Sequence, residues 1–157
     1  MIVTAKSIDD ENPELSMIAR RGYGGEAIRW KKEMDDKISV MVDGSNRIQV
    51  IQMETVNTPL CLIYVYMPSD NKDMDNEYKD TLAQITEIIK KCRNTHDILL
   101  YGDLNWSIHR SKTSHDPLLK KFLAENSLEL NQDYPEKKTF SIITGNLLDK
   151  LIIFLTK

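Results

Sequence analysis

The stretch LCLIYVYM at residues 60–67 decides the fold of this chain. It is apolar at nearly every position, which is typical of a central β-strand that is buried on both faces. Pro68 follows it, and proline cannot donate a hydrogen bond to a strand ladder, so the strand is predicted to end there. The chain is therefore built around at least one interior strand that needs cover on both sides.

The segment after this strand changes to a helical period. Between residues 76 and 91 the apolar side chains recur at spacings of four, three and four, so they lie on one face of a predicted helix. A second short apolar strand follows at Asp97–Tyr101. Strand, helix and strand in succession favour two neighbouring strands with a helix packed over them. The apolar positions of this helix are Tyr78, Leu82, Ile85 and Ile89.

Strands and a second helix are predicted on either side of this unit. Asp43-Gly44 is a strong hairpin dipeptide, and a second helix is expected to begin with Asp116 as its N-cap and Pro117 at its first turn. Hairpins followed by strand, helix and strand indicate an α+β sandwich in which helices cover sheets. The remaining expected strands are Glu26–Lys31, Ile38–Val42, Arg47–Glu54 and Leu147–Leu155, and the second helix buries Leu119, Phe122 and Leu123.

Composition is that of an ordinary globular domain. The 157 residues carry a formal charge of −3, with 41% apolar and 29% charged types, so one domain is expected. The mildly acidic balance argues against a broad basic nucleic-acid face. The paired Lys/Arg positions could contact a DNA backbone, and the favoured alternative is that they are scattered solvated surface. Two cysteines make no disulfide framework, and Cys61 is predicted to be a buried thiol. No targeting or spanning segment is visible, which favours an intracellular protein without membrane partners.

The chemical signal follows the strand at 97–101. Gly102 lets the backbone turn, and Asp103 and Asn105 then project together from the carboxyl end of the strand. In phosphoester hydrolysis a carboxylate can deprotonate an attacking water and a carboxamide can donate to the phosphate oxygen. The alternative is that these residues only form an Asx turn, which is common after strands. Tyr66 ends the neighbouring strand, and its hydroxyl is expected either to reach the same pocket or to lie at the rim of the core.

Several motifs in order resemble the endonuclease/exonuclease/phosphatase superfamily. Within it, the chain is most similar to the apurinic-endonuclease-like domain of non-LTR retrotransposon reverse transcriptases, and to the craniofacial development protein family. The likeness runs from about Arg20 to Asp149. The motifs that carry it are Arg20–Gly25, Arg47–Val50, Val65–Pro68, Gly102–Asn105, Asn131–Phe140 and Leu148-Asp149.

The resemblance implies a fold and a set of roles. The fold is a truncated four-layer α/β-sandwich of the DNase I-like type, with two mainly antiparallel sheets flanked by helices, formed by residues 20–157 after a polar N-terminal segment at 1–19. Asp103 would activate water, and Asn105 would contact the scissile phosphate. Tyr66 would be the active-site phenol, and Asp149 would orient a catalytic histidine. Relatives use Mg²⁺ or Mn²⁺ on DNA. Ser69, which stands where relatives often have asparagine, is a further candidate substrate contact. His109, just beyond Asn105, is another, and the favoured alternative is that it is a surface histidine.

The chain departs from the family pattern at both ends. Nothing before Gly22 reads as a strand that ends in the metal-binding glutamate, so the metal ligands are unknown, and no histidine segment follows Asp149. The expected function is metal-dependent phosphodiester hydrolysis by a DNA endonuclease domain of retroelement origin, weak or absent in this chain. The alternative is a non-catalytic remnant or interaction module that retains the fold. Open sheet edges would favour self-association, chiefly through residues 60–67 and 151–155.

Overall fold

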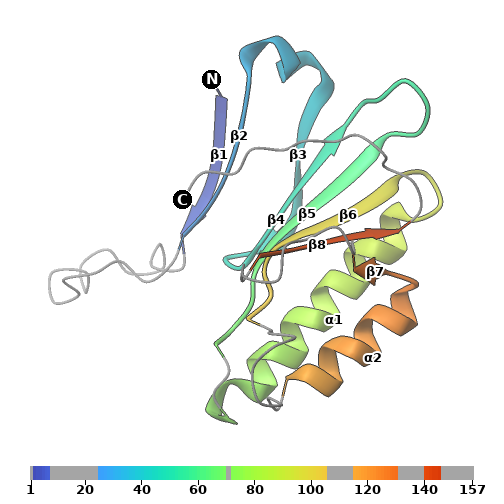
Figure 1. The fold of residues 1–157 in the computed structure, drawn as a ribbon. Coiled ribbons are helices and arrows are strands. Elements are labelled where there is room, and N and C mark those ends of the chain that lie inside the picture. The colour runs from blue at the N-terminus through green and yellow to red at the C-terminus, as the bar shows by residue number, and fades with distance from the viewer. Residues whose placement is uncertain (1, 8–24, 70–71, 106–114, 131–139, 146–157) are drawn as a thin grey trace, which may run out of the picture.

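The computed structural model describes residues 2–7, 25–69, 72–105, 115–130 and 140–145. Within them, a six-stranded sheet and a two-stranded sheet combine with two α-helices (Figure 1). The six strands follow the order β3-β4-β5-β6-β8-β7. The elements are β1 (Ile2–Ser7), β2 (Gly25–Trp30), η2 (Lys32–Lys37), β3 (Ile38–Ser45), β4 (Ile48–Met53), β5 (Leu60–Tyr66), η3 (Lys72–Met74), α1 (Asp75–Cys92), β6 (Asp97–Asp103), α2 (Asp116–Asn126), β7 (Glu129–Leu130) and β8 (Phe140–Gly145).

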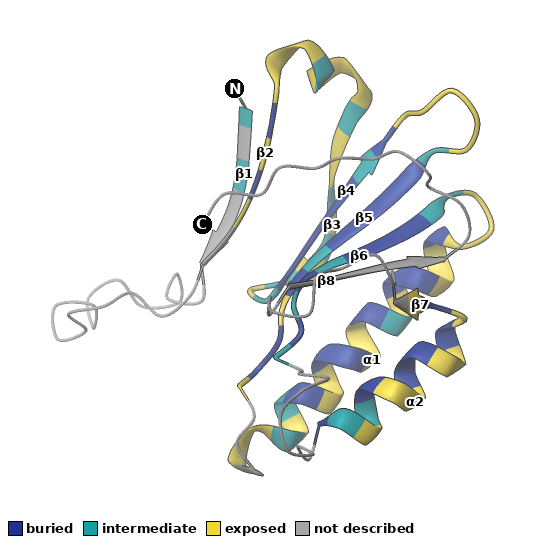
Figure 2. Cartoon of the chain, viewed as in Figure 1, coloured by how far each residue is buried: buried dark blue, intermediate teal, exposed yellow. Residues whose placement is uncertain are grey.

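Strand β5 lies in the interior of the large sheet, as its apolar sequence predicts. It pairs antiparallel with β4 and parallel with β6. Most of its residues are buried, and the burial colours of Figure 2 show the same for its two neighbours. The expectation that residues 60–67 form an open, association-prone edge is therefore wrong. Both sides of this strand are already paired.

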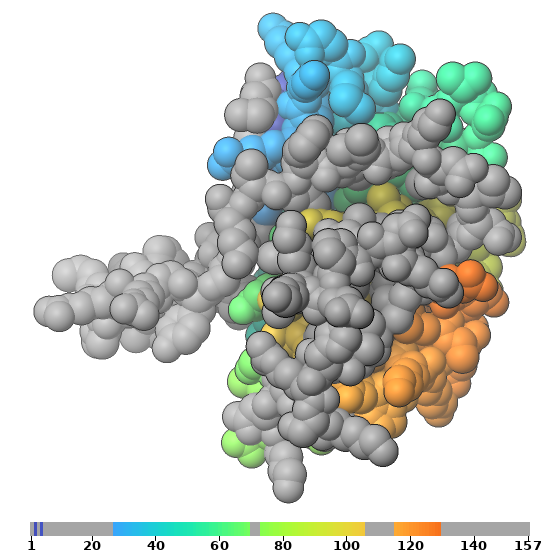
Figure 3. All heavy atoms as spheres, in the orientation of Figure 1, coloured from blue at the N-terminus to red at the C-terminus, as the bar shows by residue number. Residues whose placement is uncertain are grey.

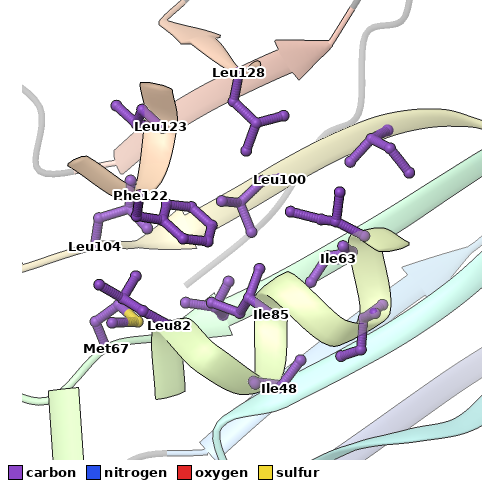
Figure 4. Close-up of a cluster of buried hydrophobic side chains, with 14 of the residues drawn as sticks. Ile48, Ile63, Met67, Leu82, Ile85, Leu100, Leu104, Phe122, Leu123 and Leu128 are labelled. Atoms are coloured by element: carbon purple, nitrogen blue, oxygen red, sulfur yellow. The ribbon is translucent and has the colours of Figure 1, made fainter. Parts of the chain in front are cut away.

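Helices α1 and α2 cover one face of the large sheet. The predicted face of α1 is confirmed, because Tyr78, Leu82, Ile85 and Ile89 are all buried. They pack with side chains of β4, β5, β6 and α2, among them Ile48, Ile63, Leu100, Phe122 and Leu123 (Figure 4). In the space-filling view α2, coloured orange, forms part of the outer surface (Figure 3).

The two-stranded sheet packs on the opposite face. Ile28 and Trp30 of β2 form a second apolar cluster with side chains from β4, β5 and β6. The described residues therefore form three layers, with the large sheet between the helices and the small sheet. The large sheet contributes Ile51, Met53, Leu60, Leu62 and Leu99 to this second apolar cluster.

Three details differ from the sequence expectations. Strands β1, β7 and β8 were not predicted: residues 2–7 form β1, which pairs with β2 and ends at Ser7 and not at a glutamate, and β8 pairs with β6 and β7. The β3–β4 turn falls at residues 46–47, whereas Asp43-Gly44 lies within β3, where the register shifts and Gly44 has φ 113°. The glycine therefore serves a bulge and not the turn. Helix α2 begins at Asp116, with His115 and not Asp116 as the N-cap.

Cys61 and Cys92 are both buried and free, as expected for Cys61. Burial raises the pKa of the Cys61 thiol above its ordinary value, and the neighbouring Cys92 raises it further. No helix in the described ranges combines the length and apolarity needed to cross a membrane. The strand expected at Leu147–Leu155 lies outside the described residues.

Candidate active site

The register of β5 and β6 brings Tyr66 next to Asp103. The two strands run parallel, and their last paired positions are Tyr66 and Asp103. The Met67 N–H donates to the Asp103 carbonyl at 2.8 Å and so extends the ladder by one bond. Paired positions project their side chains from the same face of a sheet. Two residues back, the paired Tyr64 and Tyr101 have stacked rings with centroids 5.7 Å apart, in keeping with this alternation.

Gly102 is required at the position before Asp103. Its φ is +142°, and a Cβ built on it would lie 1.9 Å from the carbonyl oxygen of Val65. No side chain fits that space, and L-residues rarely adopt that backbone conformation. The glycine therefore allows the carboxyl ends of β5 and β6 to approach closely just where the candidate residues begin.

Asp103, the last residue of β6, forms a compact turn with Asn105 at the end of this strand. The Asn105 N–H donates to the Asp103 carboxylate at 3.0 Å, and Asn105 has φ 46°, a conformation that asparagine tolerates. The Asn105 carboxamide donates across to the carbonyl of Met67, beyond the end of β5. The Asx turn that was the structural alternative is thus present, and the same contacts hold both side chains at the β5–β6 junction.

A buried layer of polar contacts supports this turn from the helix side. The Tyr78 hydroxyl of α1 donates to the Leu104 carbonyl at 3.3 Å, between the two candidate residues. The His115 ring stacks on Tyr78 with centroids 3.9 Å apart, and its Nε2 lies 2.9 Å from a carboxylate oxygen of Asp75. The first turns of both helices therefore meet beneath the candidate site. The sequence identified Tyr78 only as a core residue and gave no sign of the His115 contact.

Arg47 lies beside Tyr66 on the other side. The Tyr66 N–H donates to the Arg47 carbonyl at 3.1 Å, so Arg47, Tyr66 and Asp103 occupy one row across neighbouring chain segments. The Arg47 guanidinium carbon lies 5.9 Å from the centre of the Tyr66 ring, within the range of a cation–π contact. Arg47 has no role predicted from the sequence. Only the strand register, which the sequence does not fix, reveals its place next to Tyr66.

The predicted site residues have different outcomes. Tyr66, Asp103 and Asn105 are brought together, and Tyr66 is 37% exposed. Ser69 is exposed two residues beyond Met67. Asp149 and His109 lie outside the described residues.

The described residues do not make up a metal centre by themselves. Among them there is no group of three His, Cys, Asp or Glu side chains able to hold a metal ion. One oxygen of the Asp103 carboxylate already accepts the Asn105 N–H. The described donors therefore do not fit a preformed cage for Mg²⁺, which prefers a set of oxygen ligands in octahedral geometry.

Comparison with a solved structure identifies the fold. The endonuclease domain of TRAS1, a telomere-specific non-LTR retrotransposon, superposes with a TM-score of 0.55 over 71% of this chain and 55% of that domain, at 16% identity. The chain has a DNase I-like fold. This confirms the expected α+β class. At this identity the similarity establishes the fold alone.

Two further structures are similar to this DNase I-like chain. The human Nocturnin catalytic domain matches 71% of this chain and 49% of its own length, at 8% identity and a TM-score of 0.49. A humanized zebrafish TDP2 matches 96% of this chain and 69% of its own length, at 11% identity and a TM-score of 0.48. The chain thus spans about half the length of the first two domains. No protein-family model and no curated protein sequence matches it.

Proposed function

We propose that this DNase I-like chain acts on phosphodiester bonds, as a DNA endonuclease domain of the retroelement type. The supporting observation is the junction of β5 and β6, where Tyr66 pairs with Asp103, the Asp103 carboxylate accepts the Asn105 N–H, and the Asn105 carboxamide donates to the Met67 carbonyl. These groups match two needs of phosphodiester hydrolysis: the carboxylate is a base for water, and the carboxamide and the phenol are hydrogen-bond donors to phosphate oxygens.

In the proposed reaction, a water oxygen attacks phosphorus, the bond to the leaving sugar oxygen breaks, and that oxygen takes up a proton from solvent. Asp103 takes the proton of the attacking water, and its contact with the Asn105 N–H fixes the direction of the carboxylate. The Asn105 carboxamide has two N–H groups, of which one donates to Met67, so the second remains for a phosphate oxygen. Tyr66 lies at the rim, where its hydroxyl would contact the same phosphate.

Divalent metal dependence is part of the proposal and has its own test. A hard cation such as Mg²⁺ or Mn²⁺ would neutralise the charge that develops on the phosphate. Because the described side chains do not form a cage, we expect binding to be weak without DNA. Calorimetric titration with Mn²⁺ of the wild type and of Asp103→Asn measures it. Binding that is weaker in Asp103→Asn would support a metal at this site, and binding that is unchanged in Asp103→Asn would contradict the metal part of the proposal.

Nicking of supercoiled plasmid in Mg²⁺ or Mn²⁺ tests the reaction itself. We expect slow nicking by the wild type and none by Asp103→Ala, because the variant lacks the base. The matched control is Asp80→Ala, which removes an exposed carboxylate of α1 and should leave nicking unchanged. Nicking at the same rate in Asp103→Ala would contradict the assignment. Fast nicking that is lost in Asp103→Ala would confirm the site and contradict the expectation of weak activity.

The second candidate function is a non-catalytic module that retains the fold. The observation that favours it is the turn itself, since the Asp103 and Asn105 side chains both have structural partners. A wild type that neither nicks DNA nor binds it would favour this alternative.

A further inference from the structure

We propose that Arg47 is the phosphate-binding cation of the candidate active site, and that Glu77 is its intramolecular competitor. The inference rests on the proposed function and assigns one more residue to the same site. It begins with the row that Arg47 forms with Tyr66 and Asp103 at the end of the sheet.

The contacts of Arg47 place its positive charge at the rim of this site. Its Nε lies 2.7 Å from a carboxylate oxygen of Glu77, and its Nη1 is 3.5 Å from the Tyr66 carbonyl. The guanidinium also lies over the Tyr66 ring, 5.9 Å from its centre. The Arg47 side chain is only 14% exposed, so these partners hold it in one place.

The charge balance of the site calls for such a cation. Of the three candidate residues, Asp103 is anionic and the other two are neutral, so an approaching phosphodiester would meet repulsion. Within the described ranges, Arg47 is the cationic side chain with a contact to one of the three. A guanidinium presents five N–H donors in a planar fork that matches two phosphate oxygens. Among the described residues, the hydrogen bonds of the Arg47 guanidinium involve Nε and Nη1, so Nη2 can donate to a ligand.

Glu77 can be displaced from this arrangement. Its side chain is 43% exposed at the first turn of α1, and ion pairs at such exposure are weak. A phosphate oxygen offers the guanidinium an equivalent anionic partner. Binding of DNA would therefore exchange the carboxylate of Glu77 for a phosphate. This exchange predicts opposite effects for the two members of one ion pair.

The competing interpretation is purely structural. In it, the ion pair only fastens the β3–β4 turn to α1, and removing either partner affects stability but not ligand binding. An experiment that measures only DNA binding, with hydrolysis blocked by EDTA, distinguishes the two interpretations. The probe is a short fluorescein-labelled DNA duplex, and the readout is fluorescence anisotropy over a range of salt concentrations.

We expect Arg47→Met to weaken binding of this duplex by about tenfold or more, because a charge-assisted hydrogen bond is lost. The slope of the logarithm of the binding constant against the logarithm of the salt concentration should become shallower by about one, because one counterion fewer is released. Glu77→Gln should instead tighten binding several-fold, because the competing anion is gone. The control variants are Lys90→Met and Glu87→Gln, which remove the same charges from an exposed 2.9 Å ion pair near the other end of α1. They should leave binding close to that of the wild type.

The outcomes distinguish this inference from the function on which it rests. If the wild type binds and nicks DNA but Arg47→Met binds no worse than Lys90→Met, the inference is wrong and the function stands. If the wild type has no affinity for the duplex, both are wrong. If Arg47→Met does not fold by circular dichroism, Arg47→Lys and Glu77→Gln decide. Arg47→Lys should bind the duplex more weakly than the wild type. Binding by Glu77→Gln that equals that of the wild type would overturn the inference.

Discussion

Gly102 and Asn105 show how single residues give the junction of β5 and β6 its shape. The glycine removes a side chain that would overlap the Val65 carbonyl, and the asparagine adopts a left-handed conformation and donates to Met67. Between them, Asp103 is held at the end of its strand. A glycine, an aspartate and an asparagine after a strand could be recognised in the sequence, but the cross-strand partner of each could not.

Replacing Gly102 by alanine should damage both the stability and the site. The added Cβ would lie 1.9 Å from the Val65 carbonyl oxygen, so β5 and β6 must move apart. We expect a loss of about 2 kcal/mol or more in the free energy of unfolding, since both overlap and backbone strain contribute. Urea denaturation measures the loss. Gly44→Ala, at another positive φ but within the β3 bulge, is the comparison. Unchanged stability of Gly102→Ala would contradict the close approach of the two strands.

At the scale of elements, the segments with a clear apolar pattern were predictable from the sequence, and strands β1, β7 and β8 were not. Strands β5 and β6 are continuous apolar runs and helix α1 has a helical period, and the structure confirms all three. The β3–β4 turn was misplaced because Asp43-Gly44 suits a bulge as well as a turn. Strand β1 was missed because its short polar and apolar mixture becomes a strand only through pairing with β2. Contacts between elements, such as Arg47 with Glu77, have no local signature.

The hydrogen bond from the Tyr78 hydroxyl of α1 to the turn after β6 should stabilise the fold. Tyr78→Phe leaves the buried Leu104 carbonyl without the donor it has now. We expect the free energy of unfolding to fall by about 1–3 kcal/mol, because a buried acceptor loses its partner. Hydrogen exchange at the Asn105 amide should also accelerate, since Leu104 precedes it. Equal stability and equal exchange in the variant would show that the hydroxyl does not hold the turn.

At the scale of the whole molecule, two apolar clusters share the large sheet. One lies between this sheet and the helices, and the other lies between it and the β1–β2 sheet. Strands β4, β5 and β6 contribute residues to both clusters, so loss of one cluster exposes the strands that support the other. Layers coupled in this way should unfold together.

This coupling predicts one cooperative transition. Trp30 belongs to the small-sheet cluster, and its indole N–H donates to Asp35 at 3.1 Å. In the variant Trp106→Phe, Trp30 is the sole tryptophan, so its fluorescence reports on the small sheet. Circular dichroism at the helical minimum reports on α1 and α2. We expect the two urea transitions to coincide. A fluorescence transition at distinctly lower urea would show that the small sheet detaches first.

The parallel pairing of β5 with β6 also bears on biosynthesis. Antiparallel neighbours can join through a tight turn, but a parallel pair must wait for the intervening crossover, here α1, to be translated and docked. The phenol and the carboxylate thus leave the ribosome separately and meet only once that helix has found its place. A nascent chain arrested before β6 contains Tyr66 but not Asp103. The junction of β5 and β6 therefore forms in one late step that brings together residues far apart in the sequence.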